Sequence, residues 1–285
     1  MRKNTPLEGA HGFFHTTRAE EVIILRFSNS VFDDTTDLHK SDVILDYLDR
    51  VSECEAIKVI VINSSLQKSG TDEYREFFLA AGCEGPRAFG AGFYPSEKHT
   101  IAKFCNVINQ AISKIVDLNK IVVHVCQGDV ISLFLNFSLA CDYRIVADNT
   151  AFHNAYLEIG LLPKGGGPFF LTRMLSQARA YELLLLKKVI TAQEALEYGI
   201  VDQVVPVQKL EETALEMAHR FGQHHASSIS GIKKLVNYSF RDLHDYLQLE
   251  NQEISRIVRS PEFERQMQGM GPNPSGAGSK EIGQT

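Results

Sequence analysis

The residues that could do chemistry gather between Lys120 and Gly167, around a strand predicted at 121–125 and a helix predicted at 132–142. The first amides of a helix have no intrahelical partner, and the helix dipole is positive at that end. Ser132 is a residue type that caps helices, and Asn136 would lie one turn further on. A helix that starts in this way can bind the negative charge that develops on a substrate carbonyl oxygen.

The amino-acid sequence of this stretch is specific enough to suggest a family. From Gln127 the chain reads QGDVISLFLNFSLACDYRIV, and from Ala151 it reads AFHNAYLEIGLLPKGGG. Both resemble the second signature of the crotonase (enoyl-CoA hydratase/isomerase) superfamily, most specifically at Ser138–Ile145. Ala192–Ala195 and Tyr198–Pro206 resemble a further motif of that family. The resemblance implies an α/β fold, a crotonase-like ββα spiral with a C-terminal helical trimerisation region.

The resemblance also implies that two backbone amides hold a thioester carbonyl while an enolate forms beside it. The first falls on Ala91, within the letters AFGAG, whose spacing from Lys120 fits the family better than that of Ser69. The second falls on Leu133. The family has three glycines where this chain has Ser132, Leu133 and Phe134, and glycine lets a ligand approach the backbone closely. If both side chains turn into the core, the amide remains available and the pocket narrows. If they turn toward the substrate, they block the amide.

The two glutamates with which hydratases of this family deliver water fall here on Asn136 and Tyr156. An amide does not titrate, and a tyrosine has an ordinary pKa near 10, so neither can act as a general base near neutral pH. Glu158 is interpreted as a solvated carboxylate. The predicted catalytic set, Ala91, Leu133, Asn136 and Tyr156, therefore favours decarboxylation, C–C cleavage or isomerisation over hydration, because a bond that breaks to a carbanion needs charge stabilisation more than a base.

Five further side chains leave alternatives open. Tyr94 and Lys98 could meet a substrate carboxylate or lie at the rim of the site. His124, inside the buried strand, is more typical of a satisfied core residue than of a catalyst. Lys164 could contact the substrate or be exposed. Lys233, with its neighbour Lys234, could reach a CoA phosphate or belong to a solvated helix face.

Composition and charge argue against several classes of function. A net charge of −6 gives no support for nucleic-acid binding. No apolar run reaches transmembrane length and no signal peptide is evident, so a cytoplasmic protein is expected. The five cysteines include no CxxC pair, which predicts reduced thiols and no metal site. The resemblance implies an acyl-CoA or acyl-carrier-protein thioester as substrate, no other cofactor, and assembly as a homotrimer or a dimer of trimers.

The chain divides into four predicted regions. Residues 1–12 look loose, residues 13–206 would form the spiral core, and residues 207–268 are helical by pattern. Within the core, residues 64–87 are an insertion that could cover the pocket mouth. The tail at 269–285 has the composition of a disordered segment.

Hydrophobic periodicity predicts the elements that position these residues. Strands are predicted at 22–27 and 56–63, the second as a β-branched run buried on both faces. Helices are predicted where apolar residues recur at helical spacing, at 37–51, 73–81, 100–116, 169–186, 192–198, 210–221, 227–238 and 243–256.

Two functions remain open from the sequence, beside a third and weaker one, a hydratase with displaced catalytic groups such as Glu158. The first is an enzyme of the crotonase superfamily that acts on a thioester through an enolate and is not a simple hydratase. The second is a catalytically silent paralogue that acts as a binding or scaffolding subunit, which the Ser-Leu-Phe letters at 132–134 favour.

Overall fold

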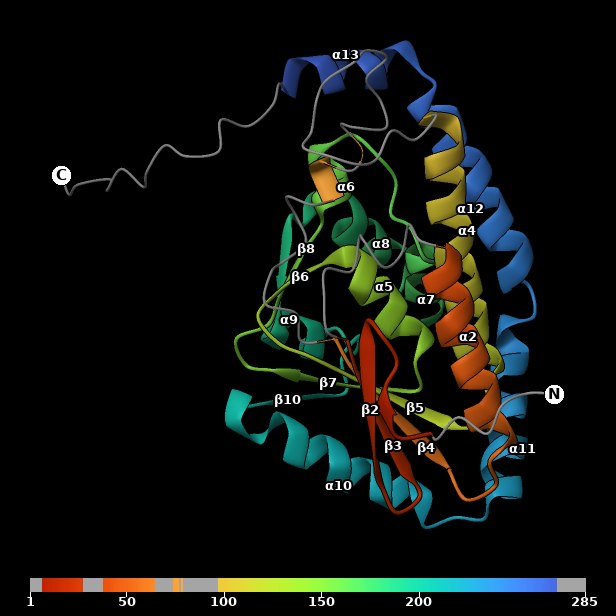
Figure 1. The fold of residues 1–285 in the computed structure, drawn as a ribbon. Coiled ribbons are helices and arrows are strands. Elements are labelled where there is room, and N and C mark those ends of the chain that lie inside the picture. Colours follow the sequence, from red (N-terminus) through yellow and green to blue (C-terminus); the bar gives the residue numbers. More distant parts are fainter. Residues whose placement is uncertain (1–6, 28–37, 65–73, 77, 79–96, 271–285) are drawn as a thin grey trace.

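The computed structural model describes residues 7–27, 38–64, 74–76, 78 and 97–270 (Figure 1). Its main sheet has seven strands in the order β1 (Gly9–Ala10), β2 (Phe14–Ala19), β3 (Val22–Phe27), β4 (Val59–Asn63), β5 (Ile121–Cys126), β7 (Tyr143–Ala147) and β10 (Gln203–Val205). The first three strands pair antiparallel and the remaining pairs are parallel. A smaller sheet contains β6 (Asp129–Ile131), β8 (Ala151–His153) and β9 (Val189–Thr191).

Helices cover both faces of the main sheet (Figure 1). One face packs on α10 (Leu210–Gly222), and the other faces α2 (Leu38–Glu53), α4 (Glu97–Asp117) and α5 (Ser132–Ala140). The other helices are α6 (Ala155–Glu158), α7 (Gly167–Met174), α8 (Gln177–Tyr181), the π-helix η1 (Glu182–Leu186), α9 (Ala192–Glu197), the 3₁₀ turns η2 (Val207–Lys209) and η3 (Tyr238–Phe240), α11 (Ala226–Asn237), α12 (Leu243–Val258) and α13 (Pro261–Met270).

The connections repeat a strand–strand–helix unit. Strand β5 lies in the main sheet, β6 in the small sheet, and α5 follows; β7, β8 and α6 repeat the order. This is the ββα arrangement that the sequence predicts.

Alternation along the central strands decides which residues face the helices that build the site. Val123 and Val125 pack with α10, so His124 between them points to the opposite face, toward α5. Strand β4 behaves in the same way, since Val59 and Val61 face α10 while Ile60 and Ile62 face α5. The β-branched run of β4 is buried on both faces, as predicted.

The start of α5 differs from the sequence prediction. Ser132 is the first helical residue, whereas the N-cap position belongs to Ile131, whose side chain cannot accept a hydrogen bond. The prediction of a Ser132 cap is wrong because β6 runs into the helix through an extended Ile131, with φ −71° and ψ 150°. Ile131 leaves the first amides without the side-chain cap that a serine there would supply.

Charged residues in the stretch that resembles the family signature form hydrogen bonds and ion pairs with other parts of the fold. The Asp142 carboxylate accepts hydrogen bonds from the Val122 amide at 2.7 Å and from Lys233 Nζ at 2.6 Å. Arg144 pairs with Asp202 at 2.8 Å. Lys233 is buried, and its ammonium also donates to the main-chain carbonyls of Ile115 and Lys120. Both alternatives for Lys233, a CoA phosphate contact and a solvated helix face, are therefore wrong.

Three other predictions need correction. The segment expected at 169–186 is not one helix, because α7 ends at Met174 and Ser176 caps the separate helix α8. The predicted loose start at 1–12 contains β1, and the Leu7 carbonyl accepts the Tyr47 hydroxyl. The predicted tail from 269 begins inside α13, which continues to residue 270.

Only parts of the predicted 64–87 insertion fall within the described residues. Residues 74–76 and 78 are helical there. The side chains of Tyr74 and Phe78 are buried, and Phe78 packs edge-on against Phe104 of α4.

Candidate active site

An apolar cavity of about 110 Å³ lies where the carboxyl ends of β3 and β4 meet α2, α4 and α5. Phe27 and Ile62 line it from the sheet, Ile44 and Ile108 from the flanking helices, and Leu133 from the start of α5; Ser64 also lies on its wall. An apolar cavity of about 150 Å³ holds a benzene molecule in another protein. The space therefore suits a short acyl group.

The second predicted oxyanion residue lies at this cavity. Leu133 is the second residue of α5, so its amide belongs to the first turn and has no intrahelical partner. Its side chain is buried in the core cluster and lines the cavity together with Phe134. Leu133 and Phe134 thus form part of the apolar wall.

Asn136 lies one turn along α5, and its side chain is bound to the main chain. Its Nδ2 donates to the Lys164 carbonyl at 2.8 Å, and the residue is buried. A Cβ atom built on Gly167 would lie 2.4 Å from Asn136 Oδ1. Asn136 therefore joins α5 to the loop that precedes α7.

Tyr156 lies in α6, and its side chain also binds the main chain. Its hydroxyl donates to the Leu184 carbonyl at 2.9 Å, and burial raises the pKa of the phenol. Glu158, at the end of the same helix, is exposed, as expected for a solvated carboxylate. Asn136 and Tyr156, which the sequence resemblance predicts at the family's glutamate positions, therefore both donate hydrogen bonds to main-chain carbonyls.

A buried ion pair behind the site was not found from the sequence. Lys164 Nζ lies 2.6 Å from Glu250 Oε1 and also donates to Asn109. The same carboxylate accepts the amides of Gly165 and Gly166, each at 2.9 Å. Glu250 thus fixes the glycine loop that follows Lys164, and neither sequence alternative for Lys164, substrate contact or exposure, describes its position.

A signal for Glu250 exists in the sequence. On α12 the buried face carries Leu243, Leu247, Glu250 and Ile254, which recur at helical spacing. A carboxylate on an apolar stripe needs a buried partner.

The other predicted residues of the first signature cannot be placed. Ala91 and Tyr94 lie outside the described residues, and so does the side chain of Lys98.

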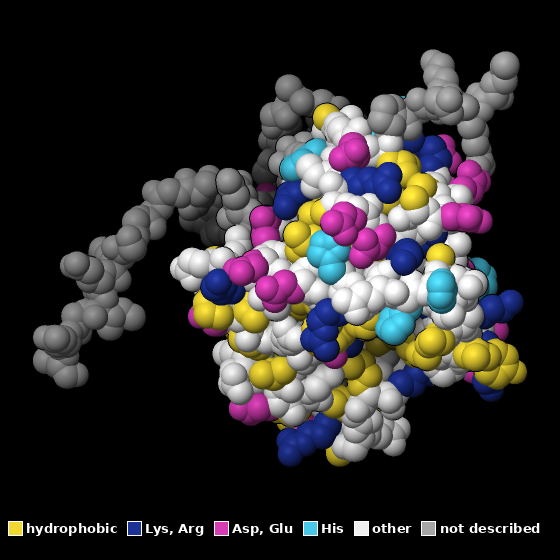
Figure 2. Space-filling view, turned by 90° about the horizontal axis from the view of Figure 1, so that it is seen from below, with side chains coloured by type: hydrophobic (Ala, Val, Ile, Leu, Met, Phe, Trp, Pro, Cys, Tyr) yellow, Lys and Arg dark blue, Asp and Glu magenta, His cyan; other side chains and the backbone are white. Residues whose placement is uncertain are grey.

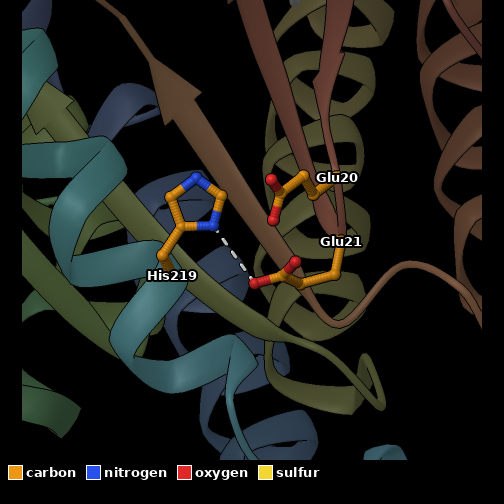
Figure 3. Close-up of side chains that lie close together, drawn as sticks. All are labelled: Glu20, Glu21 and His219. Atoms are coloured by element: carbon orange, nitrogen blue, oxygen red, sulfur yellow. Dashed lines mark hydrogen bonds and ion pairs between the residues drawn. The ribbon is translucent and has the colours of Figure 1, made fainter.

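A separate polar cluster lies at the other end of β3 (Figure 3). The ligand atoms of Glu20, Glu21 and His219 lie within 4.8 Å of one another, and His219 Nδ1 is 3.1 Å from Glu21 Oε1. Burial raises the pKa of Glu21, but the hydrogen bond from His219, with the charges of His219 and Lys58, lowers it overall. The cluster ties the β2–β3 turn to α10, far along β3 from Phe27 at the cavity.

Comparison with known proteins decides the family. The family model for enoyl-CoA hydratase/isomerase matches residues 52–271. The chain belongs to the enoyl-CoA hydratase/isomerase family.

Relatives of this family member carry several activities. It is 35% identical over 151 residues to a trans-2-decenoyl-[acyl-carrier-protein] isomerase of Streptococcus mutans, covering 53% of this chain and 56% of the relative. It is 26% identical over 226 residues to a carnitinyl-CoA dehydratase of Proteus mirabilis, covering 77% and 78%. The chain spans between about half and two thirds of the length of the first curated relatives that it matches.

Solved structures support the crotonase-like α/β fold. An enoyl-CoA hydratase of Bacillus halodurans matches with a TM-score of 0.72 and 18% identity, over 90% of this chain and 100% of that one. Among the described helices of this family member, none is both long enough and apolar enough to cross a membrane.

Proposed function

We propose that this chain acts on a short acyl thioester, of CoA or of an acyl carrier protein, through an enolate, and that it does not hydrate alkenes. The observation that carries this proposal is that the side chains of Asn136 and Tyr156 are neutral and hydrogen-bonded to the main chain. Both stand where the family places glutamates, and both bind main-chain carbonyls. Reactions that create their own carbanion, decarboxylation and C–C cleavage above all, need charge stabilisation more than a base.

In this proposal the oxyanion is held by the amide of Leu133, with that of Ala91 as the second donor. Loss of one such donor typically costs about 10²–10³-fold in rate. Asn136 and Tyr156 then keep the walls of the site in place through their main-chain hydrogen bonds. An isomerisation remains compatible if another group moves the proton.

The test is a panel of thioesters that includes malonyl-type, β-keto and β,γ-unsaturated acyl groups, followed by mass spectrometry of the products. We expect decarboxylation, cleavage or isomerisation of at least one, and no hydration of crotonyl-CoA. Efficient crotonyl-CoA hydration that is lost in Glu158→Gln would overturn the proposal, since it would identify a displaced catalytic carboxylate.

The second candidate is a catalytically silent paralogue that serves as a binding or scaffolding subunit. It is favoured by Leu133 and Phe134, which occupy glycine positions and narrow the cavity. Calorimetric titration with acyl-CoA separates the two, because a scaffold that has lost the site binds no thioester, whereas an enzyme binds and converts it.

We further propose that the chain assembles as a homotrimer, or as a dimer of trimers, through its C-terminal helices. Exposed apolar side chains on and after α11 support this, namely Ile232, Leu235, Val236 and Tyr238. Figure 2 shows the molecule from below, the side of α10 and α11, with acidic and basic side chains intermixed and several groups of apolar side chains among them, one at the right-hand edge. Contiguous exposed apolar surface often marks an interface.

A further inference from the structure

A serine and a histidine are hydrogen-bonded to each other at the wall of the cavity. Ser64 follows directly after β4, and its Oγ lies 2.7 Å from His124 Nε2. On its other side, His124 Nδ1 lies 2.8 Å from Ser138 Oγ of α5. All three residues are buried.

This row of three side chains points from the core toward the cavity. His124 faces α5 because its neighbours in β5 face α10, and its ring packs edge-on against Phe137. Ser64 and Phe137 both line the cavity, as does Leu133. Ser64 is thus the member of the row that lines the cavity.

The arrangement has the geometry of an activated nucleophile. Such a site needs a hydroxyl within about 2.6–3.2 Å of a base, and a third group that orients the base. Ser64, His124 and Ser138 satisfy these requirements in that order. Leu133, at the start of α5, lines the same cavity, and its amide belongs to the first helical turn, where amides have no intrahelical partner.

We propose that Ser64 is a nucleophile and His124 its general base, and that together they hydrolyse the acyl thioester bound in the cavity. The thioester as substrate rests on the proposed function; the acyl-serine intermediate and the release of a free thiol go beyond it.

The atoms balance with water as the other reactant. Ser64 Oγ attacks the thioester carbonyl carbon while its proton passes to His124 Nε2. The C–S bond then breaks, the thiolate leaves with that proton, and an ester of Ser64 remains. Water attacks this ester, gives a proton through His124 to Ser64 Oγ, and releases the carboxylic acid.

The surroundings of His124 keep its ring available as an acceptor. Burial and the charge of Arg144 lower the pKa of His124 to about 3, so the imidazole is neutral at physiological pH. In the working tautomer Nδ1–H donates to Ser138, and Nε2 accepts from Ser64. The same surroundings disfavour the imidazolium that forms during attack, and Ser138 supplies no carboxylate. Replacing the orienting carboxylate of a serine-protease triad lowers kcat about 10⁴-fold, so we expect slow turnover.

The experiment uses the full chain with acetyl-CoA and butyryl-CoA, and separately with an alkyl fluorophosphonate that modifies activated serines. We expect slow release of free CoA, an acyl or phosphonyl adduct on the peptide that contains Ser64, and a loss of at least about tenfold in both rates in Ser64→Ala. Ser239→Ala, which removes an exposed hydroxyl on η3, is the matched control and should retain both rates.

Mapping the adduct on the unaltered chain keeps the test decisive if Ser64→Ala folds poorly. The inference is overturned if thiol release continues unchanged in Ser64→Ala, or if the adduct maps elsewhere. It is also overturned, while the proposed function stands, if thioesters are decarboxylated or isomerised with the C–S bond intact and Ser64 unmodified. Failure of every thioester to bind in calorimetry would instead remove the proposed function, and with it the substrate assigned to Ser64.

Discussion

Water hardly reaches the ion pair between Lys164 and Glu250, whose side chains are 1% and 4% exposed. Removing one partner of such a pair leaves an uncompensated buried charge, which typically costs about 3–5 kcal/mol. Here the loss of the pair should also destabilise the glycine loop, because the Glu250 carboxylate accepts hydrogen bonds from the amides of Gly165 and Gly166.

We therefore predict that Lys164→Met lowers the free energy of unfolding by about 3–5 kcal/mol, as measured by urea denaturation. Glu250→Gln keeps a side-chain acceptor for the loop amides but leaves the ammonium unpaired, so it should also destabilise. The double variant removes both charges and should lose less than the sum of the single losses. Additive losses would contradict the coupling of the two charges.

His124 leads to a prediction about pH. Its pKa is about 3 in the folded chain, against an ordinary value of 6.5. Between these values the unfolded chain binds the extra proton, so the stability that His124 contributes is complete above pH 6.5 and falls as the pH drops toward 3. The slope is about 1.4 kcal/mol per pH unit.

The stability advantage of the native chain over His124→Gln should accordingly shrink by about 2 kcal/mol between pH 7.5 and pH 5. Urea unfolding at both pH values measures it. His244→Gln, at an exposed position of α12, controls for the loss of a histidine. An unchanged gap between the native chain and His124→Gln would contradict the burial of a neutral ring.

At the scale of elements, the approach of α5 to α7 is set by Gly167. A Cβ atom there would lie 2.4 Å from Asn136 Oδ1 and 2.8 Å from its Nδ2, so the whole amide group would have to move. Since that amide is buried and donates to the Lys164 carbonyl, a shift breaks a hydrogen bond as well as the packing.

We predict that Gly167→Ala destabilises the chain by about 1–3 kcal/mol in thermal or urea unfolding. Gly231→Ala is the matched control, because a Cβ atom on this exposed glycine of α11 meets nothing within 4 Å. The control should stabilise by up to about 1 kcal/mol through its helix propensity. Equal effects of the two variants would argue against the close contact.

The sequence predicts these elements well where periodicity carries the information. The strands at 22–27 and 59–63 and the helix at 97–117 all lie where apolar spacing puts them. Alternation also implies that His124 faces away from its valine neighbours, but not which side of the sheet holds the site. The break at Ser176 was missed because apolar residues continue at helical spacing on both sides of it.

The site is less accessible to sequence reasoning for a physical reason. Asn136 and Tyr156 can be located by their spacing, yet their main-chain partners depend on how loops fold back. Ser64 meets His124 only through the parallel pairing of β4 with β5.

At the scale of the whole molecule, some apolar surface remains uncovered by the described residues. Leu235 is 78% exposed on α11 and Leu186 is 76% exposed on η1. Apolar side chains this open are typical of surfaces that meet another chain when they gather in a patch.

We predict that the chain sediments at three times the mass of one chain, or six times, in analytical ultracentrifugation. Leu235→Glu, which places a charge on the proposed interface, should lower that mass while the circular dichroism spectrum stays unchanged. Gln248→Glu, at an exposed polar position of α12, adds the same charge elsewhere and should leave the mass unaltered. A native chain that sediments as a monomer at micromolar concentration would contradict the assembly.

The roles of Asp142, Arg144 and Asp202 have a consequence for evolution. Each of these residues ties main-chain segments or helices together, and none is among the described residues that line the apolar cavity. Selection for a folded chain alone would preserve them, even in a lineage whose ancestors had stopped turning over any substrate. Their presence therefore reports descent and foldability, and catalysis must be judged from the residues that line the cavity.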